Sequence, residues 1–545
     1  MKHPTPRAAR KQRRRQRQAP GIGPAPAALL PGQQCASLVT SAEQTLDRGD
    51  SNRARELYLM ALALRPREPT LLNALGLLET ATGAHAAAID HFRAALAALP
   101  PGTPPTTRAQ LINNLGWACW QQGDTAAAAD TFVAALYQDP TLAGAHNNLG
   151  LVRNAQGRAA EALAAFDRAV ALDPRQVQAH ENRASLLHRL GHLEAALEAC
   201  QTALCLDPGA VDTLVNLGVI LQGLDRVEAA ETAFRQALRR NPGHPGAHLN
   251  LGYTLLLQGR FREGWREHEW RWRDPQARPF LRTFSQPVWD GSPLNGATLL
   301  VHAEQGFGDT LQFVRLLPLA AARGAGRLVL ECQPSLQALL AGLADQVVAR
   351  GAPLPPCDRQ IPLLGLPLVL GIDDATIPSP AGYLPRPPPD RSRPSPAIGL
   401  VWQGGAESPT RQARSIPFAL LEPLLRALPQ ATWVSLQTGP AATDPEAHPW
   451  AAALERPPLP DFAATARVMA GLDLIVTIDT AAAHLAGALG CPVWTLLPRP
   501  ADWRWLRQGE TSPWYDRMGL FRQMVSGQWP DVVTRVVSAL TAKFS

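Results

Sequence analysis

The second half of this 545-residue chain contains three short clusters whose residue types suit chemistry on a phosphorylated ligand. The first cluster is Gly306, Gly308 and Asp309, which follows the apolar run 297–301 and precedes a helical pattern of apolar residues. A strand, a glycine turn and a helix start bring backbone N–H groups and the positive end of a helix dipole to a phosphate. The carboxylate of Asp309 has two interpretations here: an N-cap of the helix, or a catalytic base that faces a cleft.

The second cluster is Asp479 and Thr480, which end another apolar strand pattern just before a helical pattern at 481–489. At such a helix start, the threonine hydroxyl and the backbone N–H groups would face a diphosphate. His484 lies one turn inside this helix, where packing and ligand binding are alternative roles.

The third cluster is a glycine turn at Gly404, with Arg411 and Arg414 soon after it. The turn follows the apolar run 398–402. Arginine suits phosphate binding because its planar guanidinium contacts two oxygens at once and does not lose its charge.

Alternating strand and helix patterns place these clusters in two Rossmann-like α/β lobes with parallel sheets. The first lobe is expected over 297–390 and the second over 397–545, with a proline-rich connection at 375–396 and a cleft between the lobes. Strands are predicted at 297–301, 327–331 and 346–349 in the first lobe, and at 398–402, 432–436, 472–478 and 493–497 in the second.

As a set, the clusters resemble the heptosyltransferase-type GT-B glycosyltransferases (glycosyltransferase family 9), over roughly residues 296–545. The resemblance implies that Asp309 is the general base on an acceptor hydroxyl, and that Arg414 stabilises the departing diphosphate. It also implies a single displacement that inverts the anomeric centre and needs neither a metal ion nor a cofactor besides the nucleoside-diphosphate sugar. Ala481 departs from the family pattern, which has glycine there. The predicted donor-binding residues are Gly306, Gly308, Gly404, Arg411, Asp479, Thr480 and His484.

The first half of the chain carries a 34-residue repeat, marked by regularly spaced prolines with one longer interval. The period and the recurring glycine, alanine and aromatic positions resemble the tetratricopeptide repeat, a helix–turn–helix unit that stacks into an α superhelix. The array is predicted over 37–272, in about seven units. Its last unit contains Trp265, Trp270 and Trp272, which we expect to dock onto the second half beside a surface linker at 273–296.

Asparagine recurs in one register of the first helix of successive repeats. A carboxamide both donates and accepts hydrogen bonds, so a row of carboxamides on the concave face can hold an extended peptide. This row resembles the asparagine ladder of eukaryotic protein O-GlcNAc transferases, whose layout of repeats and transferase unit is also similar. The alternative is that asparagine merely suits the turn of the superhelix. The register comprises Asn114, Asn148, Asn182, Asn216 and Asn250.

The net charge of +6 belongs to the N-terminal tail, because residues 1–18 carry eight basic and no acidic side chains. We therefore expect residues 1–36 to be a disordered basic tail that is solubilising or touches an anionic surface, and we expect no specific nucleic-acid partner. No apolar stretch resembles a signal peptide or could span a bilayer, and the seven cysteines form no CxxC pair. These features favour a cytoplasmic location.

Three functions fit these patterns. The first is a glycosyltransferase, of hexosyl, heptosyl or N-acetylglucosaminyl type, which modifies a protein or peptide presented by the repeats. The second is a non-catalytic scaffold with a degenerate transferase region, favoured by Ala481 and by the short first lobe. The third is a lipopolysaccharide-type sugar transferase held at a membrane face by the basic tail. We expect the first, because Asp309, Arg414 and Asp479 are retained together.

Overall fold

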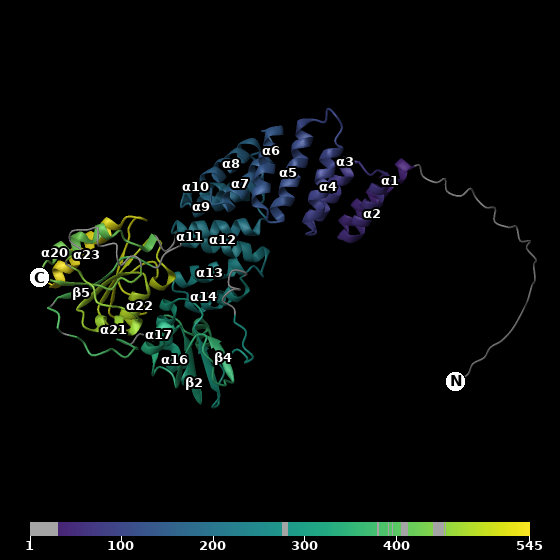
Figure 1. The fold of residues 1–545 in the computed structure, drawn as a ribbon. Coiled ribbons are helices and arrows are strands. Elements are labelled where there is room, and N and C mark those ends of the chain that lie inside the picture. The colour runs from purple at the N-terminus through teal and green to yellow at the C-terminus, as the bar shows by residue number, and fades with distance from the viewer. Residues whose placement is uncertain are drawn as a thin grey trace, which may run out of the picture. The chain divides into compact units, whose positions relative to one another are not determined.

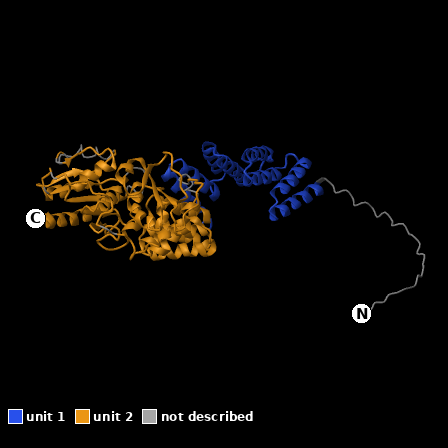
Figure 2. Ribbon diagram, turned by 90° about the horizontal axis from the view of Figure 1, so that it is seen from below, with its two compact units in different colours: residues 1–176 blue, residues 177–545 orange. Residues whose placement is uncertain are grey.

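The computed structural model describes residues 31–274, 282–378, 381–390, 392–394, 396–404, 413–439, 452 and 454–544. The chain forms two compact units, residues 1–176 and 177–545 (Figure 2), and each is described by itself. The boundary falls inside the predicted repeat array 37–272, so the repeats are shared between both units. Of the predicted tail 1–36, residues 1–30 lie outside the described residues, and a helix already begins at Pro31.

Unit 1 is a stack of helix pairs (Figure 1). A Cβ atom at Gly76 would lie 2.6 Å from the ring of Phe92, and a Cβ atom at Gly150 would lie 2.5 Å from the ring of Phe166. Carbon atoms in contact are about 3.5–4.0 Å apart, so only glycine lets the ring of the second helix lie against the first. The helices are α1 (Pro31–Asp47), α2 (Ser51–Leu64), α3 (Pro69–Ala81), α4 (His85–Ala98), α5 (Pro105–Gln121), α6 (Thr125–Gln138), α7 (Ala143–Ala155) and α8 (Ala159–Leu172).

Unit 2 begins with further helix pairs of the same kind. Gly218 and Phe234 repeat the glycine–ring contact, at 2.4 Å from the built Cβ atom. In the preceding pair, Ala184 and Cys200 take the two positions and both are buried. The glycine is therefore absent where no ring requires it. The helices are α9 (Val177–Arg189), α10 (Leu193–Leu206), α11 (Val211–Gly223), α12 (Val227–Arg240), α13 (Pro245–Leu257) and α14 (Phe261–His268), followed by the 3-10 helix η1 (Glu269–Arg273).

The first lobe is built on a four-stranded parallel sheet of order β3-β2-β1-β4. Its strands are β1 (Thr298–His302), β2 (Arg327–Cys332), β3 (Gln346–Ala349) and β4 (Arg359–Pro362). The sequence patterns predicted the first three, and β4 was missed. Its helices are α15 (Phe307–Phe313), η3 (Val314–Leu316), α16 (Leu317–Ala321), α17 (Pro334–Leu340), η4 (Leu363–Gly365) and α18 (Leu366–Leu370).

The second lobe has a six-stranded parallel sheet of order β10-β9-β8-β5-β6-β7. Its strands are β5 (Ala397–Val401), β6 (Thr432–Ser435), β7 (Leu454–Glu455), β8 (Leu474–Ile478), β9 (Val493–Leu497) and β10 (Met518–Arg522). Its helices are η5 (Phe418–Leu421), α20 (Glu422–Ala427), α21 (Phe462–Ala470), α22 (Ala481–Ala488), η9 (Trp503–Trp505) and α23 (Trp529–Phe544). The fold class is as predicted: helical repeats followed by an α/β region with two parallel sheets, consistent with two Rossmann-like lobes.

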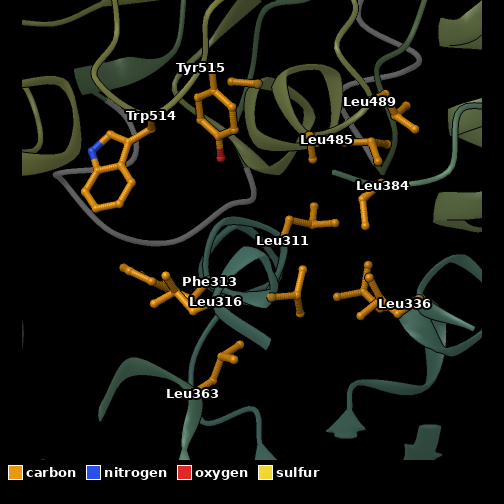
Figure 3. Packing of buried hydrophobic residues seen from close by; sticks show 14 of the residues in the cluster. Leu311, Phe313, Leu316, Leu336, Leu363, Leu384, Leu485, Leu489, Trp514 and Tyr515 are labelled. Carbon is orange, nitrogen blue, oxygen red and sulfur yellow. The ribbon is translucent and has the colours of Figure 1, made fainter. Parts of the chain in front are cut away.

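One hydrophobic core joins the two lobes and the last repeat. Figure 3 shows Leu311 and Phe313 of the first lobe below Leu485 and Tyr515 of the second. Trp265 of the last repeat is buried and its indole N–H donates to the backbone oxygen of Ile372 at 3.1 Å. The expected docking of the last repeat onto the α/β region is confirmed for Trp265.

The predicted surface linker 273–296 is partly built into the first lobe instead. Residues 275–281 lie outside the described residues. Beyond them, Val288 forms a parallel bridge with Gln360, and Trp289 is buried with its indole N–H on the oxygen of Ser292 at 2.8 Å. This segment packs on the lobe because packing removes the large apolar surface of Trp289 from water.

Among the described helices, none has both the length and the hydropathy needed to cross a membrane.

Candidate functional site

A cleft of about 940 Å³ is enclosed by both lobes and by repeats of unit 2. It gathers every sequence-predicted catalytic and donor-binding residue within the described part of the chain, whereas Arg411 lies outside that part. The predicted residues that line the cleft are Gly306, Gly308, Asp309, Gly404, Arg414, Asp479, Thr480 and His484.

Asp309 lies in the first turn of α15, but the N-cap is Gly306. Its Oδ2 accepts a hydrogen bond from the backbone N–H of Gly306 at 2.9 Å, and its Oδ1 accepts one from the guanidinium of Arg504. The N-cap interpretation is thereby corrected: the carboxylate holds the helix start from within the first turn. An ionised carboxylate has about four acceptor sites, so it can still receive a ligand hydroxyl from the cleft.

Arg504 is the principal cleft residue that the sequence analysis missed. Besides Asp309, its guanidinium donates to Gln312 Oε1 at 2.9 Å and to Asp502 Oδ1 at 2.8 Å. Burial by itself lowers the pKa of Arg504, but the charges of Asp502, Asp309 and Asp479 outweigh burial and raise it above its ordinary value. No motif marks this arginine, which is 195 residues from Asp309 in sequence.

Arg414 and Asp479 form the second ion pair of the cleft. Nη1 of Arg414 donates to Asp479 Oδ2 at 3.0 Å and to the backbone oxygen of Asp479 at 3.3 Å. Burial and then the charge of Asp502 raise the pKa of Asp479, while Arg414 and Arg504 oppose the rise. The pair fixes one edge of the Arg414 guanidinium on the end of β8. Asp479 therefore positions Arg414, which also lines the cleft.

Position 308 requires glycine because helices α15 and α22 pack closely against each other there. A Cβ atom at this position would lie 2.8 Å from Cδ2 of His484 in α22. His484 is buried, its Nδ1 lies 2.8 Å from the hydroxyl of Tyr515, and its ring stacks on Trp505 at 5.2 Å. Burial and the charges of nearby arginines hold the pKa of His484 well below its ordinary value, so the imidazole is neutral. The geometry supports the packing role for His484, although one edge lines the cleft.

The start of helix α22 lines the cleft. Thr480 is the N-cap with φ −145° and ψ 175°, and its side chain makes no capping hydrogen bond. Its hydroxyl turns back to the oxygen of Ile478 at 3.4 Å instead. The first N–H groups of an α-helix have no acceptor within the helix, and the methyl group of Ala481 stands beside them in the cleft wall.

The glycine turn at Gly404 is held in place by Gln437, another residue that no motif indicated. Oε1 of Gln437 accepts from the backbone N–H groups of Trp402 at 3.1 Å and Gln403 at 3.0 Å. Its Nε2 donates to the oxygen of Gln403 at 3.1 Å. The carboxamide thus replaces backbone pairing where β5 ends, and it fixes the direction in which Gly404 meets the cleft.

The repeats close the cleft with side chains of their own. Burial raises the pKa of the Tyr253 hydroxyl, and Gln222 donates to the hydroxyl of Thr254 at 2.7 Å. An ion pair of 3.0 Å between Arg499 and Asp225 joins the second lobe to the loop after α11. These side chains carry no motif that marks them in the sequence, which predicts ligand contacts in the repeats only for the asparagine register. The repeat residues that line the cleft are His188, Val219, Gln222, Gly223, Tyr253, Leu257 and His268.

Three asparagines of the predicted ladder form hydrogen bonds to other residues of the repeats. Nδ2 of Asn114 donates to Asn73 Oδ1 at 3.0 Å, and Nδ2 of Asn148 donates to Asn113 Oδ1 at 2.9 Å. Asn250 donates to the oxygen of Gly246 in its own helix at 2.8 Å. These bonds join successive repeats or stabilise one helix, which supports the structural interpretation. Each donating amide keeps a second N–H, and neither Asn182 nor Asn216 belongs to the wall of the cleft.

Within the described residues, no group of three or more His, Cys, Asp or Glu side chains is arranged to hold a metal ion. The cleft instead presents two arginines among three aspartates. Such an arrangement can hold an anion at the arginines and accept a proton at a carboxylate.

Comparison with known proteins identifies the repeats. Tetratricopeptide-repeat family models match residues 42–103 and 109–142, and a model for the middle TPR-like domain of cilia and flagella-associated protein 70 matches residues 153–259. The chain is therefore a tetratricopeptide-repeat protein with a C-terminal α/β region. Protein FlbA of Caulobacter vibrioides is 28% identical over 323 residues, which are 52% of this chain and 53% of FlbA. The chain thus spans about half the length of this curated relative.

Solved structures are similar over parts of the chain. The crystal structure of MamA is 20% identical with a TM-score of 0.28, over 30% of this chain and 96% of MamA. PilF of Pseudomonas aeruginosa is 19% identical with a TM-score of 0.34, over 40% and 96%. The type IV pilus biogenesis factor PilW is 22% identical with a TM-score of 0.36, over 40% and 99%.

Proposed function

We propose that the chain is an inverting glycosyltransferase that moves a sugar from a nucleoside-diphosphate sugar to a protein or peptide acceptor. One observation carries the proposal: a single cleft between two parallel α/β lobes gathers Asp309, Arg414 and Asp479, the residues on which the heptosyltransferase-type resemblance rests. The tetratricopeptide repeats support a polypeptide acceptor, because such arrays present extended concave surfaces for binding.

The donor half of the site is the second lobe. The diphosphate would lie at the start of α22, between the helix N–H groups and Arg414. Asp479 holds Arg414 by an ion pair of 3.0 Å, so the guanidinium is oriented before the ligand arrives. Charge that develops on the departing diphosphate is then met by groups already in place, which is the arrangement that lowers a barrier.

The acceptor half of the site contains Asp309. As the acceptor hydroxyl oxygen bonds to the anomeric carbon, its proton passes to the Asp309 carboxylate, and the bond from the anomeric carbon to the diphosphate oxygen breaks with its electron pair on the diphosphate. Arg504 forms an ion pair with this carboxylate and so positions it in the cleft. The charges of Arg414 and the helix start perform the neutralisation that a divalent cation performs in other transferases.

A second candidate is the non-catalytic scaffold, in which the repeats bind a partner and the α/β region is only a folded module. Two observations favour it: the Ala481 methyl group stands where the phosphates would approach, and the Asp309 carboxylate is already paired with Arg504.

Nucleotide binding separates the two candidates. Purified protein is titrated by calorimetry with the common nucleoside diphosphates and their sugars, in parallel with Arg414→Ala and with Arg426→Ala, an exposed arginine of α20 in the same lobe. We expect one nucleotide to bind, and we expect Arg414→Ala alone to weaken it by about tenfold or more, the loss typical of a charged phosphate contact. Absence of binding by every nucleotide, or equal binding by all three proteins, would favour the scaffold.

A further inference from the structure

A second cavity, of about 480 Å³, lies at the carboxyl ends of the strands of the first lobe. It is bounded by η1, by the segment at Phe284 and Val288, and by residues that follow β1, β3 and β4, and it shares no lining residue with the cleft. Ligands of open parallel sheets bind at this edge, and the volume is within the range of small-molecule sites. We call it the first-lobe cavity.

Arg350, directly after β3, gives the first-lobe cavity an available positive charge. One guanidinium nitrogen, Nη2, donates to the backbone oxygen of Ala303, and the buried Nε has no hydrogen-bond partner among the described residues. None of the described carboxylates forms an ion pair with it, whereas Arg282 on the same wall is paired with Glu331. A buried guanidinium N–H without a partner is costly, and an arginine fork fits a carboxylate in two-point contact.

His302, at the end of β1, adds a neutral polar group. It is 5% exposed, its Nε2 lies 2.9 Å from Gln360 Oε1, and its Nδ1 is buried without a partner among the described residues. Because the Gln360 oxygen only accepts, Nε2 carries the hydrogen and Nδ1 is left as an acceptor. Two residues that line the cavity therefore each have a buried polar atom without a partner among the described residues: a donor on Arg350 and an acceptor on His302.

The other residues that line the cavity determine which ligand shape and which ligand charge fit it. The ring of Phe284 lies against His302 at 4.5 Å, and Leu368 and Val369 of α18 complete an apolar surface. Glu269 and Glu304 also line the cavity. Both carboxylates are paired with Arg271, and Arg282 is paired with Glu331, so a ligand with a single negative charge is enough to balance Arg350.

We propose that the first-lobe cavity binds a small carboxylic acid with a flat, apolar body, its carboxylate on Arg350 and its ring against Phe284. This site does not depend on the cleft or on sugar transfer. A ligand here is in contact with the last repeat through η1 and with the strand that leads to Asp309, so it joins the repeats to the first lobe.

Binding is tested on the full chain by fluorine NMR with 4-(trifluoromethyl)benzoate and its neutral analogue 4-(trifluoromethyl)benzyl alcohol. We expect the benzoate to bind at least about tenfold more tightly than the alcohol. Arg350→Gln should reduce that preference to less than about threefold. Val288→Glu adds a negative charge at an exposed rim position (63% exposed). It should weaken the binding of the benzoate and leave the binding of the alcohol unchanged, while Val288→Gln should change the binding of neither compound.

Arg414→Ala serves as the control for the cleft and should leave benzoate binding unchanged. The proposal is overturned if the alcohol binds as well as the benzoate, if the preference survives in Arg350→Gln, or if Arg414→Ala abolishes binding. If Arg350→Gln does not fold, the pair Val288→Glu and Val288→Gln decides the question, because the side chain of Val288 is exposed and a loss specific to the charged variant cannot come from unfolding.

Discussion

At the residue scale, both oxygens of Asp309 are already engaged, one by the N–H of Gly306 and the other by Arg504. If Asp309 is the base, Asp309→Asn keeps the shape but removes the proton acceptor. We expect kcat to fall by about 10²–10⁴-fold and nucleotide affinity to change less than about threefold. Asp531→Asn, on the exposed side of α23, is the matched control. Full activity in Asp309→Asn would remove the base role, and lost nucleotide binding would assign Asp309 to the donor.

His302 makes a second prediction at this scale, because burial lowers its pKa from 6.5 to about 4. Between these values the unfolded chain binds a proton at this histidine that the folded chain does not, so stability is lost as pH falls. At pH 4.5 this difference in proton binding lowers the free energy of unfolding by an amount on the order of 2 kcal/mol. Thermal unfolding of wild type and His302→Gln at pH 7 and pH 4.5 measures it. The variant should lose less stability on acidification, and an equal loss in both proteins would contradict the assignment.

At the element scale, several repeats depend on a ring of the second helix lying against a glycine of the first, as Phe166 lies against Gly150. We expect Gly150→Ala to destabilise unit 1 by about 1–3 kcal/mol, because the new methyl group would overlap the ring of Phe166. Gly144→Ala in the same helix meets no atom within 4 Å. It should be neutral, or stabilising by up to about 1 kcal/mol. Urea unfolding followed by circular dichroism compares the two variants, and equal effects would show that the contact does not matter.

At the scale of the whole molecule, the cleft is built entirely from residues of unit 2, from His188 to Arg504. A chain of residues 177–545 should therefore bind nucleotide within about threefold of the full chain. A chain of residues 282–545 should not fold stably, because it lacks Trp265, whose removal exposes the core beneath it. Calorimetry and thermal unfolding of both chains test this. A stable, nucleotide-binding 282–545 chain would show that the repeats are dispensable for the α/β region.

Sequence periodicity determined the parts that depend on neighbours along the chain. The 34-residue period fixed the helix pairs, and alternating apolar runs gave most strands of both lobes to within a few residues, since buried parallel strands are continuous apolar segments. β7, with two residues, and β4 and β10, which carry polar or charged residues, gave no such signal. The cleft motifs were also visible, because glycine turns and helix starts are local features.

Only the tertiary structure decided what those motifs contact. Arg504 reaches Asp309 across 195 residues, Gln437 holds the turn at Gly404, and repeat side chains close the cleft; no spacing in the sequence encodes these pairings. Gly308 shows the difference most clearly. The sequence predicts that Gly308 lets the backbone approach a phosphate. In the fold, the absence of a side chain at Gly308 leaves room for the ring of His484. The sequence specifies which side chains are available and which local elements carry them, whereas burial and contacts between distant segments decide how each side chain is used.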